Sequence, residues 1–117
     1  MAIPSGSGTE VLKRFIKDGQ DNTESKAIDG VADHIYTVLS IIVKNQAGST
    51  KEFYIKIAPS AGTQIMILST SIASGDTFVW NDKFVLSSGD ALAFRSDENS
   101  SADDFDIYIS FIDQDWS

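Results

Sequence analysis

Hydrophobic and polar residues alternate along most of this chain, in short segments separated by turn-forming residues. The clearest example is residues 51–58, where Phe53, Ile55 and Ile57 alternate with polar side chains. A period of two is typical of a β-strand that buries one face. Residues 9–16 and 105–113 follow the same pattern. The chain therefore predicts strands rather than amphipathic helices over most of its length.

Turn residues divide the chain into about eight such segments. They are residues 9–16, 35–44, 51–58, 64–72, 77–80, 83–86, 91–95 and 105–113. We expect residues 17–22 to form a turn, and the polar stretch that continues to residue 33 to form a surface loop. Short strands at this spacing predict an all-β, single antiparallel β-sandwich. We expect a jelly-roll-like fold, with an immunoglobulin-like sandwich as the alternative.

Residues 35–44 give the strongest strand pattern, because apolar side chains occupy both faces. One predicted face holds Ile35, Thr37, Leu39, Ile41 and Val43, and the other holds Tyr36, Val38, Ser40 and Ile42. A strand that is apolar on both sides is expected in the centre of a sheet, covered on both sides over part of its length.

The length of 117 residues matches one domain. Residues 1–8 are small and rich in glycine and serine, so we expect a flexible N-terminal arm with Ile3 as its apolar anchor. The β-sandwich domain is then predicted over residues 9–117. The arm is a candidate for ordering on a partner surface.

Composition excludes several functional classes. The net charge of −8 opposes binding to nucleic acid and to anionic membranes. The absence of cysteine excludes disulfides, thiolate metal sites and cysteine nucleophiles. No apolar run approaches the roughly 18 residues of a membrane span. We expect no cofactor.

Catalytic chemistry has little support in the sequence. His34 is the single histidine, and Asp33 beside it is the nearest group that could orient it as a general base. A histidine at the edge of a strand with its polar tip in water is the favoured interpretation. No motif isolates a pair of carboxylates, so we expect a protein without enzymatic activity.

The stretch 97–104 is the most acidic part of the chain. Its hard oxygen ligands suit Ca²⁺, although the spacing is not that of an EF-hand loop. A solvated loop is the favoured interpretation. The weak calcium candidates are Asp97, Glu98, Asp103 and Asp104.

Two further groups are candidates for contact with a protein partner. Trp116 has little chain after it to bury it, and tryptophan is a frequent interface anchor, although packing on its own domain is the alternative. Trp80 is expected in the core or at its rim. The basic residues Lys13, Arg14 and Lys17 form a small cluster, for which an exposed strand face is the favoured role.

Residues 2–14, 35–45, 84–90 and 112–117 together resemble small virion structural proteins of tailed bacteriophages, especially those of cyanobacterial phages. The resemblance touches under half of the chain and includes no catalytic signature. It implies a β-sandwich located in the virion after synthesis in the host cytoplasm. A capsid decoration (cement) protein of this kind binds the major capsid protein, often as a trimer, and uses terminal arms.

The resemblance also allows a protein of the tail, baseplate or fibre that binds other virion proteins. A rival of a different class is a carbohydrate- or Ca²⁺-binding module, with Tyr36, Tyr54 or Trp80 as a stacking platform. For the virion function, the expected protein interface consists of Ile3, Pro4, Val11, Leu12, Arg14 and Trp116.

Overall fold

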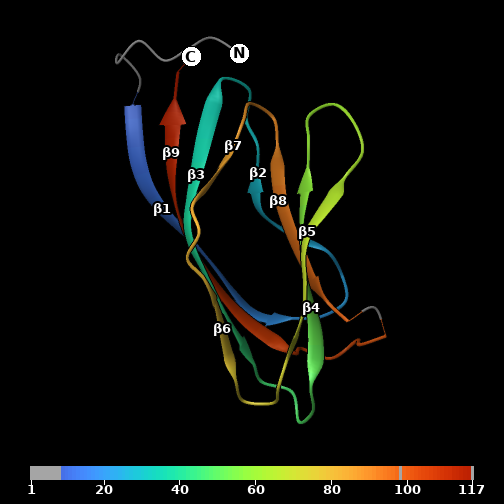
Figure 1. The fold of residues 1–117 in the computed structure, drawn as a ribbon. Coiled ribbons are helices and arrows are strands. Elements are labelled where there is room, and N and C mark those ends of the chain that lie inside the picture. Colours follow the sequence, from blue (N-terminus) through green and yellow to red (C-terminus); the bar gives the residue numbers. More distant parts are fainter. Residues whose placement is uncertain (1–8, 98, 117) are drawn as a thin grey trace.

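The computed structural model describes residues 9–97 and 99–116, which form nine β-strands in two antiparallel sheets (Figure 1). None of these residues forms a helix long and apolar enough to cross a membrane. The strands are β1 (Thr9–Gln20), β2 (Ser25–Asp29), β3 (His34–Asn45), β4 (Lys51–Ala58), β5 (Ile65–Ile72), β6 (Thr77–Trp80), β7 (Phe84–Leu86), β8 (Ala91–Ser96) and β9 (Phe105–Asp115).

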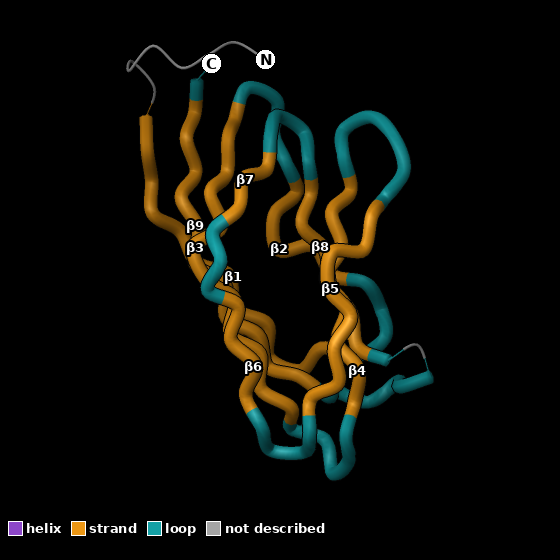
Figure 2. The backbone as a smooth tube through the Cα atoms, viewed as in Figure 1, coloured by secondary structure: helices purple, strands orange, loops and turns teal. Residues whose placement is uncertain are grey.

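The two sheets lie face to face as the layers of a sandwich (Figure 2). The first sheet has the order β1-β9-β3-β6, and the second has the order β2-β8-β4-β5. Strand β7 also pairs with β3, beside a different stretch from β6, so β6 and β7 together act as one interrupted edge strand. Eight strand positions in two layers of four, with successive strands changing layer except from β4 to β5, make a jelly roll. The predicted jelly-roll-like sandwich is confirmed.

Aromatic side chains join the two layers in the core. The ring of Phe53 on β4 meets that of Phe105 on β9 edge-on, with centroids 5.2 Å apart. Phe15 on β1 meets Phe94 on β8 in the same way at 5.6 Å. The alternation predicted for β4 and β9 is confirmed, because Phe53 and Ile55 on β4 are buried, as are Phe105, Ile107, Ile109 and Phe111 on β9.

The predicted loop between residues 17 and 33 is wrong in two places. Strand β1 continues to Gln20, because Gly19, at φ 83°, is accommodated as an irregularity of the strand rather than as a turn. Strand β2 pairs with β8 where a loop was expected. Its register shifts between Lys26 and Ile28, so its short sequence shows no clean period of two.

An irregularity also changes the faces of β3. The register with β9 shifts between Val38 and Ser40, which leaves Leu39 as an extra residue. The expected assignment of residues to faces is therefore wrong across this strand, because one inserted residue exchanges the two faces. The inward side chains are Tyr36, Val38, Ile41 and Val43.

Candidate functional site

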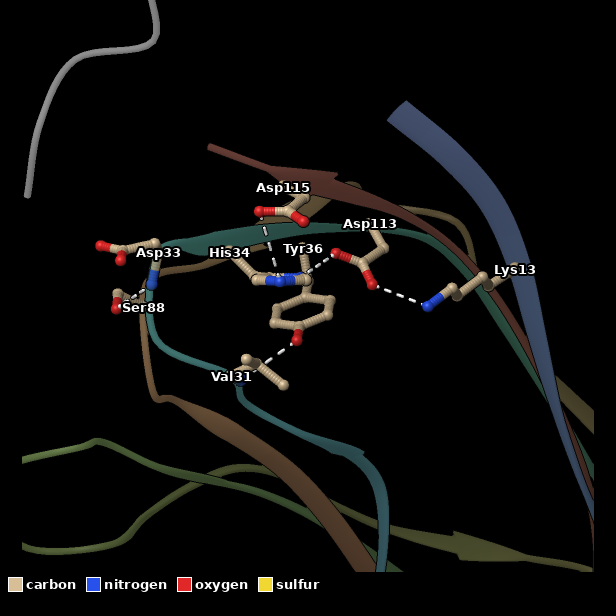
Figure 3. Close-up of polar contacts among 8 residues, drawn as sticks. All are labelled: Lys13, Val31, Asp33, His34, Tyr36, Ser88, Asp113 and Asp115. Carbon is tan, nitrogen blue, oxygen red and sulfur yellow. Dashed lines mark hydrogen bonds and ion pairs between the residues drawn. The ribbon is translucent and has the colours of Figure 1, made fainter. Parts of the chain in front are cut away.

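A polar clamp connects three strands of the first sheet near one end of the sandwich (Figure 3). Asp113 on β9 accepts a hydrogen bond at Oδ2 from Lys13 Nζ on β1, at 2.8 Å. Its Oδ1 lies 2.7 Å from Nδ1 of His34 on β3. The Asp113 side chain is only 7% exposed. One buried carboxylate on the middle strand thus holds both neighbouring strands.

Two opposing effects determine the pKa of Asp113. Burial raises it, but the hydrogen bonds from Lys13 and His34 outweigh burial, so the pKa lies below its ordinary value. The hydrogen bond to Asp113 raises the pKa of Lys13. The clamp is therefore an ion pair at neutral pH.

The second ring nitrogen of His34 also faces a carboxylate, since Nε2 lies 3.6 Å from Oδ1 of Asp115. The imidazole stacks on Tyr36, with ring centroids 5.9 Å apart. This arrangement holds strands together and offers no hydroxyl or thiol nucleophile to the ring nitrogens among the contacts of the described residues.

The favoured interpretation of His34, a strand-edge residue with its polar tip in water, is wrong, because its side chain is 19% exposed and both ring nitrogens face carboxylates. Asp33, the alternative partner, does not orient the ring either. The backbone N–H of Asp33 donates to Ser88 Oγ, and its carbonyl accepts from the N–H of Trp116. The partner of the imidazole is Asp113, 79 positions away in the sequence, so local spacing gave no sign of it.

The acidic stretch 97–104 is only partly a solvated loop. Asp104 is 1% exposed, and its Oδ2 accepts a hydrogen bond of 2.6 Å from Ser96 Oγ. Asp97 accepts a hydrogen bond from the backbone of Asn99. Glu98 lies outside the described residues. Among residues 9–97 and 99–116, no three histidine or carboxylate side chains are grouped to hold a metal ion.

The residues predicted to form an interface lie in different places. Ile3 and Pro4 fall outside the described residues. Leu12, 72% exposed, and Arg14 lie on the outer face of β1, whereas Val11 lies on its opposite face. Trp116 is half-buried on its own domain, and its indole Nε1 is shielded from solvent without a hydrogen-bond partner among the described residues. The structure thus brings Leu12 and Arg14 together and separates them from Val11.

The outer face of the first sheet carries exposed hydrophobic side chains that the sequence did not group. Cross-strand pairing aligns them, together with the half-buried Ile112 and Thr37, in two rows. The lower row in Figure 1, at the β6 end of the sheet, is Ile16, Tyr108, Ile42 and Val79, and the upper row, at the β7 end, is Leu12, Ile112, Thr37 and Val85. We call this surface the apolar face. The outer face of the second sheet is mostly polar, although Met66, 48% exposed, lies beside Lys56. Its polar side chains include Lys26, Glu52, Tyr54, Lys56 and Arg95.

The exposed fractions show how incompletely one chain covers the apolar face. Ile16 is 53% exposed, Val79 48% and Ile42 38%. The expectation that residues 35–44 are covered on both sides is therefore wrong for Ile42 within the described chain. Contiguous exposed apolar surface is typical of a protein contact site.

Two open hollows lie on the apolar face, one on each side of Tyr108. The larger, about 480 Å³, is lined by Ile16, Ile42 and Tyr108, with Lys44 and Asp106 at its end. The smaller, about 290 Å³, lies next to Leu12 and Arg14. Tyr108 thus projects between two concave areas.

The stacking platform expected for a carbohydrate-binding module is not present. Tyr36 is 4% exposed. The guanidinium of Arg95 lies over the Tyr54 ring, 4.4 Å from its centroid. Trp80 points inward against Phe84, as a rim residue of the core. None of the three rings is free to receive a sugar.

Comparisons with known proteins extend only to structure. No family model matches the chain, and no curated protein matches it. A pilus protein of Bacillus endospore appendages is similar in fold, with a TM-score of 0.58 and 17% identity over 100% of this chain and 97% of the other.

A chain of the infectious bursal disease virus T13 particle has a TM-score of 0.57 and 5% identity, over 91% of this chain and 31% of the other. A chain of the Gx strain of that virus has a TM-score of 0.51 and 7% identity, over 97% of this chain and 32% of the other. At these identities the likeness establishes the fold alone. The chain thus has the β-sandwich fold of a pilus subunit and of virus-particle proteins.

Proposed function

We propose that this chain is a non-enzymatic structural subunit of a virion, and specifically a capsid decoration protein that binds the assembled head of a tailed phage. The observation that carries the proposal is the apolar face, which one chain leaves open to solvent. A protein with such a surface is completed by contact with a partner protein. The polar outer face of the second sheet suits the opposite side, which faces solvent.

The fold supports the same role. Sandwiches of this kind form a pilus and virus particles in the solved structures described above. The described residues offer a structural ion-pair clamp rather than a catalytic arrangement. The resemblance to virion proteins of tailed phages adds the placement on the head.

Attachment to an assembled shell has a direct thermodynamic effect. A protein that binds only the assembled state stabilises that state by mass action. We assign the attachment to Ile3 and Pro4 in the arm, and we assign Leu12 and Arg14 on β1 to contacts through the apolar face. The resemblance favours a trimer on the head, whereas the geometry of the apolar face favours a pair.

A second candidate is a subunit of a tail, fibre or other filament. It is favoured by the end-to-end match with the pilus protein, which covers nearly the whole of both chains. That protein belongs to disulfide-linked pili, whereas the present chain has no cysteine. Any filament of this chain would be held by non-covalent contacts, for which the apolar face is suited.

Removal of residues 1–8 tests the attachment. We expect the chain of residues 9–117 to bind purified heads of the parent phage at least tenfold more weakly than the full chain, at an unchanged melting temperature. Co-sedimentation of labelled protein with heads gives the measurement. Equal binding by the shortened chain would refute the role of the arm. Absence of binding by the full chain would refute decoration and favour the filament.

A further inference from the structure

We infer that the apolar face pairs with the apolar face of a second copy of this chain, about a twofold axis that runs along the strands between β9 and β3. This inference deepens the proposed function by naming the partner of that surface. It requires only that the apolar face is a contact surface, whichever particle the chain belongs to.

The register of the first sheet makes its outer face self-complementary. Rotation by half a turn about this axis places β9 on β3 of the second copy and β1 on the β6–β7 edge. Each residue keeps its position along the strands, and we call a set of cross-strand neighbours at one such position a level. Tyr108 then faces Ile42 of the second copy, since the two are cross-strand neighbours at one level. Ile16 faces Val79 at the same level.

The upper row of the apolar face matches itself in the same way. Leu12 on β1, which is 72% exposed, faces Val85 on β7 of the second copy, which is 58% exposed. Both belong to the level of Ile112 and Thr37. Apart from the contact of Ile112 with Thr37, apolar side chains therefore meet apolar side chains at both levels, which removes surface from water on both copies.

Charges beside the lower row fit the same axis. Asp106 on β9 and Lys44 on β3 are cross-strand neighbours one level beyond Tyr108. The rotation places Asp106 of each copy over Lys44 of the other, so two attractive contacts form by symmetry. Ser110 and Ser40, which share the level between the two rows, also meet across the pair.

The alternative face-to-face pair has its twofold axis perpendicular to the strands, and it lacks this pairing of opposite charges. That rotation places β1 on β1, so that Arg14 meets Arg14 at the level of Ser110. It also brings Asp18, beside Asp106, toward Glu10, beside Gln114. Like charges in a contact suppress the wrong arrangement. The charge pattern therefore selects the axis along the strands.

The shape of the face agrees with a contact between two sheets. Sheets that pack face to face lie about 10 Å apart and cross at about −30°. The hollow of about 480 Å³ beside Tyr108 gives room for an apolar side chain of the second copy. Pairing through the β1 edge is disfavoured, because Lys13 and Lys17 lie on the inward-facing side of that edge strand.

Thiol cross-linking tests the pairing, because the natural chain has no cysteine. Facing sheets lie too far apart for a direct disulfide, so the probe is a bifunctional thiol reagent with a spacer of about 10 Å. Within one chain, β9 and β3 separate Ile16 from Val79 by three strand spacings, roughly 14 Å, which exceeds the reach of that reagent. In the proposed pair, each Ile16 lies against Val79 of the other copy. The variant carrying both Ile16→Cys and Val79→Cys should therefore form a covalent dimer with this reagent, at least tenfold more than either single variant.

The other outcomes identify the other arrangements. A cross-linked dimer from Leu12→Cys with Ile16→Cys, without one from the first pair, would show the axis across the strands and overturn the inference. Ladders of trimers and larger species would show a head-to-tail contact and also overturn it. The melting temperature of the double variant under reducing conditions shows whether it folds like the natural chain. If it does, still binds heads and forms no dimer, the pairing is refuted and the decoration role stays intact.

Discussion

Replacement of Phe53 by alanine is expected to lower the free energy of unfolding by about 4 kcal/mol. Phe53 is completely buried and lies between the rings of Phe94 and Phe105, with centroids at 6.1 Å and 5.2 Å. Its contact with Phe105 joins the two layers, so the truncation leaves a cavity between the sheets. A cavity of this kind adds to the lost transfer energy, because the surrounding side chains relax only partly.

The neighbouring residue provides the control for this variant. Glu52 is exposed on the outer face of the same strand, so Glu52→Ala should change stability by well under 1 kcal/mol. Urea denaturation followed by fluorescence measures both variants. A loss below 1 kcal/mol for Phe53→Ala would show that the two layers do not pack through this residue.

Replacement of Asp113 by asparagine is the second large effect. At pH 7 we expect a loss of about 2 kcal/mol of stability, because the buried carboxylate bonds to the Lys13 ammonium and to the His34 ring. The loss is smaller than for a fully buried pair, since Lys13 is 47% exposed and is rehydrated when its partner is removed. Asp29→Asn, at a side chain 80% exposed, should change stability by less than about 0.5 kcal/mol.

The lowered pKa of Asp113 fixes the sign of the pH dependence. A carboxyl whose pKa is lower in the folded state stabilises the protein at pH values above its pKa in the unfolded state, which is about 4. That contribution is lost as the pH falls through the folded value. The difference in stability between the natural chain and Asp113→Asn should therefore be present at pH 7 and shrink on acidification below about pH 4. A difference that grows on acidification would contradict the clamp.

Local alternation predicted the strands well where nothing interrupts the period of two. β4 and β6 coincide with the predicted segments, and β9 is longer by two residues, to Asp115. The faces of β3 were predicted wrongly because an inserted residue at Leu39 leaves no mark in the composition of the strand. β2 was missed because its own sequence lacks a period of two, and it is a strand through its pairing with β8. Irregularities and edge strands depend on tertiary pairing, which a local pattern does not contain.

The candidate site was less accessible from the sequence for the same reason. Leu12 and Arg14 were predicted as interface residues, and both lie on the outer face of β1. The apolar face is assembled from β1, β3, β6, β7 and β9, whose order in the sheet is not written in the order of the chain. The exposed Tyr108, on an otherwise alternating strand, was the one local signal. Without the register, that residue had no visible relation to Ile42 or Val79.

The two outer faces differ in polarity, and this difference is the structural basis of the proposed function. The second sheet presents mostly charged and polar side chains, and the first presents two largely apolar rows with charged side chains between and beside them. A subunit built in this way has one side for water and one side for a partner. Pairing through the apolar face would form a four-layered unit with mostly polar outer surfaces.

The mass of the full chain in solution, measured by light scattering over a range of concentrations, decides whether two copies pair through the apolar face. We expect a mass approaching twice the 12.7 kDa of one chain. Tyr108→Asp, which places a charge in the apolar face, should return the mass to that of a single chain, whereas Ser71→Asp, on the outer face of the second sheet, should not. A single-chain mass at every concentration, or equal masses for the natural chain and Tyr108→Asp, would contradict the pairing.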